Sequence, residues 1–420
     1  MELPRRQFLG LIPVSALSLQ LGSFATAHEG ARKNTSPLIA SPPVVQHPAS
    51  DSFTVHFAVS ALDTGWVEWG TSADQLDRVA VAARHGLVCA SNQALSVRVR
   101  LDESLAGKPI FYRVVAQSLA YKDGYHLERG EAVASPVYRL RLPDAKADRI
   151  TIAIVNDTHE NRQTLATLHT RVAAVAPDVL IWNGDTCNNF DAQDDPLQIV
   201  LNPAGDLSQA WAAERPLLFV PGNHDVRGER ARELSAGLGG WPGQTELPYN
   251  FAVRLGPVAL IGLDTGEDKP DAHPVFAGTA AYEPYRELQS AWLKAAVASP
   301  EIAEAPIRIA ICHIPLRGRP GDNDGTTLEG YASYSGMGAK LWLPTLRQAR
   351  FAAVISGHTH RHRIDDASEA EPVMQVVGGG PQPERATLTI LRAEPGKAEL
   401  QVEDLEGKVL SHRKWNTSVG

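Results

Sequence analysis

Five apolar segments in the chain each end in a cluster of polar residues, and this arrangement constrains the fold most strongly. They are residues 149–157, 177–185, 216–225, 306–315 and 351–360. Stretches with apolar residues at helical spacing lie between them, at 162–176 and 284–298. Strands that alternate with helices indicate an α/β sheet covered on both faces. In such sheets ligands bind just beyond the carboxyl ends of the strands, so we expect the five clusters to converge.

The polar clusters offer carboxylate, amide and imidazole groups. They are Asn156-Asp157-Thr158-His159, Gly184-Asp185, Gly222-Asn223-His224-Asp225, Cys312-His313 and Gly357-His358-Thr359-His360. Carboxylates and imidazoles together suit manganese, iron, zinc and similar ions. The ligands are too many for one catalytic ion with an open position. They fit two ions about 3.5–4 Å apart that share a carboxylate.

The rest of the chain predicts a second, all-β region. Between 41 and 143, short runs of alternating apolar and polar residues are separated by Gly, Asp or Pro. This pattern is typical of a sandwich of roughly 100 residues. Residues 143–148 predict a linker, and β-strands at 373–380, 386–394 and 397–410 close an α/β domain that we expect over 149–415.

The first 27 residues predict an export signal. Arg5 and Arg6 precede Phe8, Leu9 and a short apolar stretch, and Ala25-Thr26-Ala27 supplies the small residues of a cleavage site. The arginine pair resembles a twin-arginine signal, which implies that the twin-arginine machinery exports the folded chain. A general secretory signal that carries two arginines, or an uncleaved anchor, is the alternative.

The composition of the chain limits the kinds of partner that it can bind. The net charge is −8 without a long acidic or basic run, which argues against a nucleic-acid-binding surface. We expect no transmembrane segment in the mature chain, because the apolar part of the leader is short and interrupted. Cys89, Cys187 and Cys312 are too widely spaced for a disulfide framework or a zinc finger.

In order along the chain, DTH, GD, GNHD, H and GHTH resemble the motifs of the calcineurin-like metallophosphoesterase family over roughly residues 149–380. The resemblance implies a four-layer α/β/β/α domain and a binuclear centre of divalent or trivalent ions, with iron, manganese or zinc as the options. It also implies that hydroxide bound to the metals attacks a phosphate ester. In the β region, Val67-Glu68-Trp69-Gly70 and Tyr112-Arg113-Val114 resemble the fibronectin-III-type domain that precedes the catalytic domain of purple acid phosphatases.

The same resemblance assigns a role to each residue of the motifs. The implied ligands are Asp157, His159 and His360 for the first ion, Asn223, His313 and His358 for the second, and Asp185 for both. His224 would protonate the leaving-group oxygen, and Asp225 would orient His224. We expect no residues that bind an organic cofactor.

One position departs from the purple enzymes. These carry a tyrosine three residues after the bridging aspartate, where this chain has Asn188. Without a phenolate ligand, we do not expect their purple colour. The Asp-x-His form of the first motif and GNHD rather than GNHE favour the phosphodiesterase-type branch of the family.

Three further features suggest how substrate would be contacted. The glycine-rich residues 317–338 predict either a wall of the substrate site, with Tyr331 and Tyr334 as stacking groups, or a mobile surface loop. Arg227 would contact a phosphate or lie on the surface. The acidic segment 188–196 would disfavour highly anionic substrates.

The histidine run GHTHRHR leaves open which of its members bind metal. On an extended strand, alternate residues are about 6.6 Å apart, so His358 and His360 would reach two ions from one side. His362 would lie about 13 Å from His358. We therefore expect His362 to be a solvent-facing bystander.

We expect an exported phosphoesterase, periplasmic or secreted from a bacterium, that acts on a small-molecule phosphoester and favours phosphodiesters. A phosphomonoesterase that scavenges phosphate is the first alternative. The second is an envelope binding protein with a structural metal site.

Overall fold

The computed structural model describes residues 37–241, 244–324 and 332–417. The predicted export signal lies outside these residues. Within them, no helix is both long enough and apolar enough to cross a membrane. All three cysteines are free thiols, and Cys312 is fully buried.

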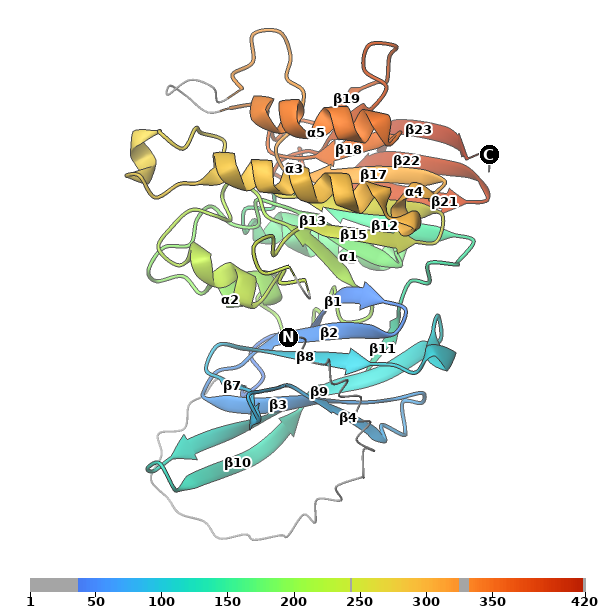
Figure 1. Cartoon of the computed structure of the whole chain (residues 1–420). Helices are drawn as coiled ribbons and strands as arrows, with labels where there is room; N and C mark the ends of the chain where they lie inside the picture. Colours follow the sequence, from blue (N-terminus) through green and yellow to red (C-terminus); the bar gives the residue numbers. More distant parts are fainter. Residues whose placement is uncertain (1–36, 242–243, 325–331, 418–420) are drawn as a thin grey trace, which may run out of the picture. The chain divides into compact units, whose positions relative to one another are not determined.

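The region that begins at Ile39 is all-β and forms two sheets and a short hairpin (Figure 1). The first sheet contains β1 (Val44–Ala49), β2 (Ser52–Ala58) and β8 (Ala94–Arg100). The second contains β3 (Asp63–Gly70), β4 (Arg78–Val81), β7 (Ala90–Ser91), β9 (Pro109–Tyr121), β10 (Leu127–Ala134) and β11 (Tyr138–Arg141). The hairpin is β5 (Ala83–Arg84) and β6 (Leu87–Val88). Alternate side chains such as Phe53, Val55 and Val97 face inward and form the core between the sheets.

Two six-stranded sheets form the α/β region. The first has the order β14 (Leu217–Val220), β13 (Val179–Asn183), β12 (Ile150–Val155), β21 (Thr387–Glu394), β22 (Gly396–Asp404) and β23 (Val409–Thr417). The second has the order β15 (Phe251–Leu255), β16 (Val258–Leu263), β17 (Ile307–Cys312), β18 (Ala353–Ser356), β20 (Met374–Val377) and β19 (Arg363–Asp365). Apolar side chains such as Ile152, Ile309 and Leu391 fill the space between the two sheets.

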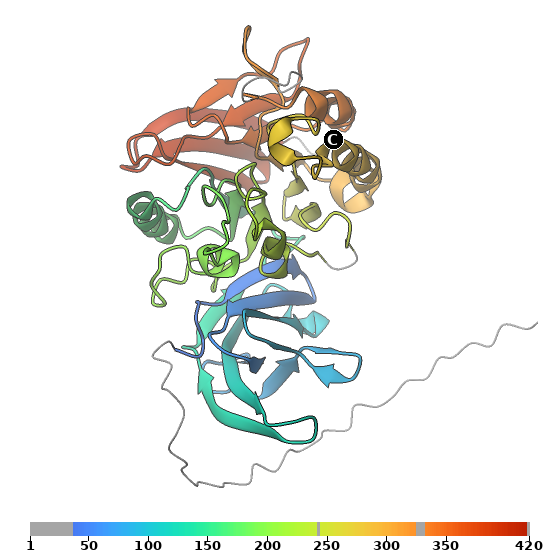
Figure 2. The ribbon, with the colours of Figure 1, turned by 90° about the vertical axis from the view of Figure 1, so that its left-hand side faces the viewer.

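Helices cover the outer face of each sheet (Figure 2). On the first sheet they are α1 (Arg162–Val175), α2 (Pro196–Leu201) and the 3-10 helix η2 (Ala231–Ala236). On the second they are α3 (Tyr282–Ala298), α4 (Pro300–Ala303) and α5 (Gly336–Gln348). Two shorter 3-10 helices are η1 (Glu103–Leu105) and η3 (Pro274–Phe276). The predicted four-layer α/β/β/α order is therefore confirmed.

Local sequence explains why the helix after the first polar cluster forms where it does. The side chain of Asn161 caps α1 by accepting a hydrogen bond from the backbone N–H of Thr164 at 3.1 Å. Leu165, Leu168 and Val172 recur at helical spacing and are buried. The helix ends at Val175, because the next residue, Ala176, has a left-handed backbone (φ 47°).

The direction of the strands brings the polar clusters to one edge. β12, β13 and β14 run parallel, as do β16, β17, β18 and β20. Because the carboxyl ends of parallel strands lie on the same side of a sheet, every cluster follows a strand that points to that edge.

The all-β region packs directly on the α/β region, and the described residues of both belong to one compact unit. Val44 and Ala58 belong to the same apolar core as α1 and α2. The backbone N–H of Val45 donates to the Ala212 carbonyl at 2.8 Å. The buried Tyr112 hydroxyl donates to the Ala213 carbonyl at 2.8 Å.

Candidate metal centre

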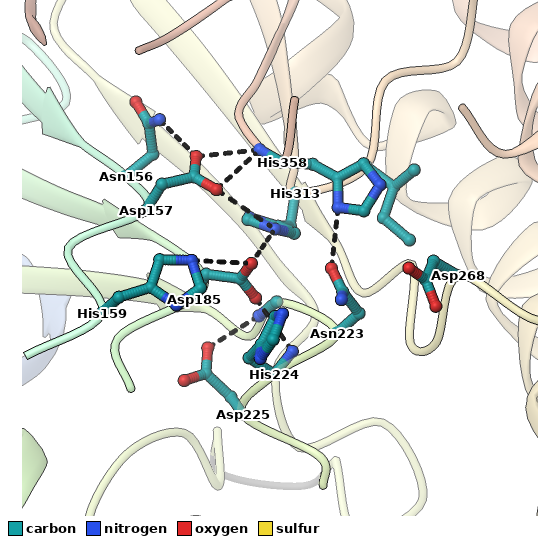
Figure 3. A network of polar contacts seen from close by, with 12 residues as sticks. Asn156, Asp157, His159, Asp185, Asn223, His224, Asp225, Asp268, His313 and His358 are labelled. Atoms are coloured by element: carbon teal, nitrogen blue, oxygen red, sulfur yellow. Dashed lines mark hydrogen bonds and ion pairs between the residues drawn. The ribbon is translucent and has the colours of Figure 1, made fainter. Parts of the chain in front are cut away.

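The side chains predicted as metal ligands meet at the shared edge of the two sheets (Figure 3). Two sets have ligand atoms within 4.8 Å of one another: Asp157, His159, Asp185 and His360 in one, and Asp185, His313 and His358 in the other. The amide oxygen of Asn223 lies 2.8 Å from Nδ1 of His358, beside the second set. Asp185 belongs to both sets, as a bridging carboxylate must.

Contacts within the sets are those of groups that face a common centre. Nε2 of His159 lies 3.4 Å from Oδ2 of Asp185. Nε2 of His360 lies 3.3 Å from Oδ1 of Asp157. Both carboxylates are buried, with exposed fractions of 1% or less.

The backbone of the site is strained in a way that aims these side chains. Five of the expected ligands have left-handed backbone angles: Asp157 (φ 49°), His159 (φ 43°), Asp185 (φ 51°), His358 (φ 70°) and His360 (φ 54°). A non-glycine residue in this region costs about 1–3 kcal/mol and persists only when its surroundings enforce it. Such residues cluster at functional sites, and here they turn each chain segment sharply after its strand.

Two glycines in the motifs leave room for the carboxylates. A Cβ atom on Gly222 would overlap Oδ1 of Asp185, and one on Gly357 would overlap Oδ2 of Asp157. Glycine precedes the ligands in GNHD and GHTH because only a residue without a side chain permits this close approach.

The donor set fits metal ions. Nε2 of His313 is buried and has no hydrogen-bond partner in the described structure, although it lies 3.2 Å from Oδ2 of Asp185. Burial lowers the pKa of His313, but Asp185 and Asp157 outweigh this effect and raise the pKa to about 10. An imidazole nitrogen without a partner, facing two carboxylates, is suited to a cation such as zinc, iron or manganese.

The electrostatics around Asp185, the expected bridging carboxylate, also fit a metal site. Burial alone would raise the pKa of Asp185, yet the neighbouring His313 and His159 hold it well below its usual range. Burial also lowers the pKa of His159, but hydrogen bonding and attraction to Asp185 outweigh it and raise the pKa. The site therefore keeps Asp185 ionised and able to bridge.

The histidine run is not the extended strand that we expected. β18 ends at Ser356, and both His358 and His360 lie in the loop that follows it. Their left-handed backbone, rather than the spacing of a pleated strand, directs them to different metal sets. His362 lies outside both sets and is half-buried rather than fully exposed. Its two ring nitrogens contact the Val377 carbonyl at 2.9 Å and the Ser411 hydroxyl at 2.7 Å.

Asp225 supports the site through the backbone rather than by orienting His224. Its Oδ1 accepts hydrogen bonds from the N–H and hydroxyl of Thr186, at 2.9 and 2.5 Å. Its Oδ2 accepts one from the N–H of Gly222 at 2.8 Å. The carboxylate therefore fixes the turn that carries Asn223 and His224 to the strand end that carries Asp185.

His224 stands beside the first metal set without belonging to it. Its ring packs edge-on against His159, with centroids 4.8 Å apart. Nδ1–H donates to the carbonyl of Asn188 at 2.5 Å, and Arg227 Nη1 donates to Nε2 at 3.1 Å. Burial lowers the pKa of His224, and the nearby Arg227 lowers it further.

Arg227 is half-buried, and its guanidinium is already paired with carboxylates. Its Nε and Nη2 donate to the carboxylate of Glu267 at 2.5 and 2.9 Å. Nη2 also donates to Asp268 at 2.9 Å. Nothing in the sequence pointed to Glu267 and Asp268, because they follow β16 with no recognisable motif.

The other segments near the site have structural tasks. Asp195 caps α2 by accepting from the N–H groups of Leu197 and Gln198. Within residues 317–338, the last part belongs to α5, which begins at Gly336. Tyr334 lines a cavity of about 260 Å³ together with Asp268 and Met337. Tyr331 lies outside the described residues.

Asn188, which replaces the tyrosine of purple acid phosphatases, joins two site residues. Its amide oxygen accepts a hydrogen bond from Nδ1–H of His159 at 3.1 Å, so Nε2 of His159 faces the first metal set. Its carbonyl oxygen accepts from His224. The sequence marked this position as unusual but did not reveal the contact.

We expect Asn188→Leu to weaken binding at the first metal set about 10- to 100-fold, because the orientation of His159 is lost. Titration of metal-depleted protein with zinc would measure this. Asn188→Asp keeps an acceptor oxygen and serves as the matched control. Equal affinities for both variants and the native chain would contradict the role of Asn188.

Comparisons with known proteins agree with this fold. The purple acid phosphatase PPD1 from yellow lupin (Lupinus luteus) seeds is 12% identical with a TM-score of 0.64, over 90% of this chain and 75% of that one. PhoD is 11% identical with a TM-score of 0.58, over 92% of each chain. At these identities the likeness shows a shared fold. No curated protein sequence matches significantly.

A sequence model of the calcineurin-like phosphoesterases matches residues 150–362, which contain every expected ligand. The chain therefore belongs to the calcineurin-like phosphoesterase family and is a metal-dependent hydrolase of phosphoric esters.

Proposed function

We propose that the chain is an exported phosphodiesterase with a binuclear centre of iron, manganese or zinc ions. The observation that carries the proposal is the pair of ligand sets that share Asp185. Bound at these sets, the ions would polarise the phosphate and supply a nucleophile from water at neutral pH.

The residues of the chain itself hold the ions and move one proton. Asp157, His159 and His360 would hold the first ion, Asn223, His313 and His358 would hold the second, and Asp185 would serve both. His224 delivers a proton to the leaving oxygen from Nε2, after this nitrogen has taken up a proton and released the hydrogen bond that it accepts from Arg227. Its ring lies beside the ligand sets and belongs to neither. Asp225 keeps the turn before His224 in place.

The charge around the site supports a diester. A phosphomonoester carries about −1.5 to −2 charge near neutral pH, whereas a diester carries about −1. Arg227 is the guanidinium that contacts His224, and it is already paired with Glu267 and Asp268. A second phosphate charge would therefore find no free cation at Arg227.

We expect bis(4-nitrophenyl) phosphate to be hydrolysed with a kcat/KM at least about tenfold above that of 4-nitrophenyl phosphate. The rate at which metal-loaded protein releases nitrophenol gives kcat/KM for each of the two esters. The alternative is a phosphomonoesterase, which is favoured by the all-β region and by the fold shared with PPD1 over 90% of the chain. A higher kcat/KM for the monoester would establish that alternative instead.

Asp185→Ala and Asn223→Ala should each lower diesterase turnover at least about 100-fold, because each removes a ligand of the second ion. Metal content and turnover should be measured on the same preparations. Arg84→Gln, an exposed change in β5, is the control. Native turnover in both variants would exclude the binuclear mechanism. Metal bound by the native chain without any turnover would favour a structural site in a binding protein.

His224→Ala should reduce hydrolysis of methyl phenyl phosphate about 100-fold or more, because phenol is a poor leaving group that needs a proton. Methyl 4-nitrophenyl phosphate should lose less, since nitrophenolate leaves without one. The comparison of kcat for the two esters is the measurement. Equal losses, with metal content unchanged, would argue against proton transfer by His224.

Export would follow from the arginine pair at the start of the chain, which lies outside the described residues. With both Arg5 and Arg6 replaced by Lys, we expect the protein to accumulate in the cytoplasm. Immunoblots of periplasmic and cytoplasmic fractions would show this. Undiminished export of the double variant would instead support a general secretory signal.

A further inference from the structure

A buried asparagine beside the first metal set has contacts that neither the ligand motifs nor the proposed mechanism uses. Asn156 directly follows β12 and is 7% exposed. Its Nδ2 donates to Oδ2 of Asp157 at 2.5 Å (Figure 3). The same nitrogen donates to the carbonyl of Gly379 at 2.8 Å, across 223 residues of sequence. Asn156 therefore ties an expected metal ligand to a distant segment of the chain.

The two carboxylate oxygens of Asp157 have different surroundings. Oδ2 accepts hydrogen bonds from Asn156 and, at 2.8 Å, from the backbone N–H of His358. Oδ1 lies 3.0 Å from that N–H, 3.3 Å from Nε2 of His360 and 3.9 Å from Nε2 of His313. Because Asn156 occupies Oδ2, the oxygen left to face the imidazoles of the site is Oδ1.

Three consecutive glycines, residues 378–380, form the segment that holds Asn156. We expected them to continue a strand, but β20 ends just before them and they form a loop, called here the glycine loop. Its three N–H groups donate in order to the Ser356 carbonyl at 2.8 Å, the Thr387 hydroxyl at 2.7 Å and the Arg385 carbonyl at 3.3 Å. The carbonyl that Asn156 meets is therefore fixed in place.

Glycine is required on both sides of Asn156. A Cβ atom on Gly378 would lie 2.0 Å from Oδ1 of Asn156, and one on Gly357 would lie 2.9 Å from its Nδ2. A Cβ atom on Gly380 would lie 2.5 Å from Cβ of His360, so the glycine loop also contacts a ligand directly. Only residues without a side chain permit such close approach. The amide of Asn156 is thus confined with its N–H directed at the carboxylate.

We propose that Asn156 is a positioning residue for the first metal ion, which fixes Asp157 so that this carboxylate offers Oδ1 alone to the ion. The inference rests on the binuclear centre of the proposed function. An amide is suited to this task because it donates a hydrogen bond without a positive charge, which would repel the ion. Catalytic metal sites keep a position open for water or substrate, and a carboxylate that offers one oxygen takes up only one position.

The test measures the two ions separately, in two backgrounds. Asn223→Ala removes a ligand of the second ion and His360→Ala removes one of the first, so each background leaves one set to be titrated with zinc. With Asn223→Ala, the further change Asn156→Leu should raise the Kd for zinc about 10- to 100-fold, because it keeps most of the volume and loses the donor. With His360→Ala, it should leave the Kd unchanged. Calorimetry of metal-depleted protein gives both values.

A second substitution distinguishes hydrogen bonding from packing. Asn156→Ser fills less space but keeps a hydroxyl that can donate to Asp157, so its first set should bind zinc more tightly than that of Asn156→Leu. Gly378→Ala should weaken the first set too, because its methyl group would displace Asn156. Gly124→Ala is the matched control, because a Cβ atom there would meet nothing within 4 Å.

The outcomes separate this inference from the proposed function. Tighter zinc binding by Asn156→Leu than by Asn156→Ser, or equal losses at both sets, would assign Asn156 to packing alone and overturn the inference. An unchanged first-set Kd in Asn156→Leu, with native turnover of a phosphodiester, would overturn it and leave the proposed function standing. A native chain that binds no zinc and hydrolyses no phosphodiester would refute the proposed function itself.

Discussion

The structure depends on how it accommodates three buried carboxylates at one edge of its sheets. Asp157, Asp185 and Asp225 are each 1% exposed or less, and an uncompensated buried charge costs several kcal/mol. Asp157 and Asp225 are compensated by the protein, through the backbone N–H groups of His358 and Gly222. Asp185 is compensated largely by imidazoles. The strained turns after the strands bring these carboxylates, N–H groups and imidazoles together at one point. A cation bound there would replace part of the stabilisation that the imidazoles give to Asp185.

The sequence revealed those parts of the fold that depend on local pattern. The buried strands, α1 and α3 follow from apolar spacing, and the ligands follow from their places at strand ends. It did not reveal α5, because Gly336, Gly338 and Pro344 lower its helix propensity. Nor did it reveal β10, which is exposed along its whole length and has no apolar alternation. In α5 and β10, contacts with the rest of the fold override the local sequence preference.

The site was predictable to the extent that its residues belong to motifs. The partition of ligands into two sets agrees with the geometry, but the reason we gave for His358 and His360 was wrong, since a left-handed loop carries them. The contacts of Asn188, Glu267 and Asp268 could not be foreseen. They join segments up to 41 residues apart, and a single sequence carries no signal for such pairs.

The order of strands has a consequence for how the chain reaches its final form. β12 lies at the centre of the first sheet, between β13 and β21, so Ile154 pairs with Thr389 from near the end of the chain. Likewise, Val45 in β1 can form its hydrogen bond with Ala212 only after the chain has been made as far as that residue. During synthesis the central strand therefore remains without one neighbour until nearly all residues have been made, and pairing across such distances is slow. A chain built in this way completes its folding only after translation has finished.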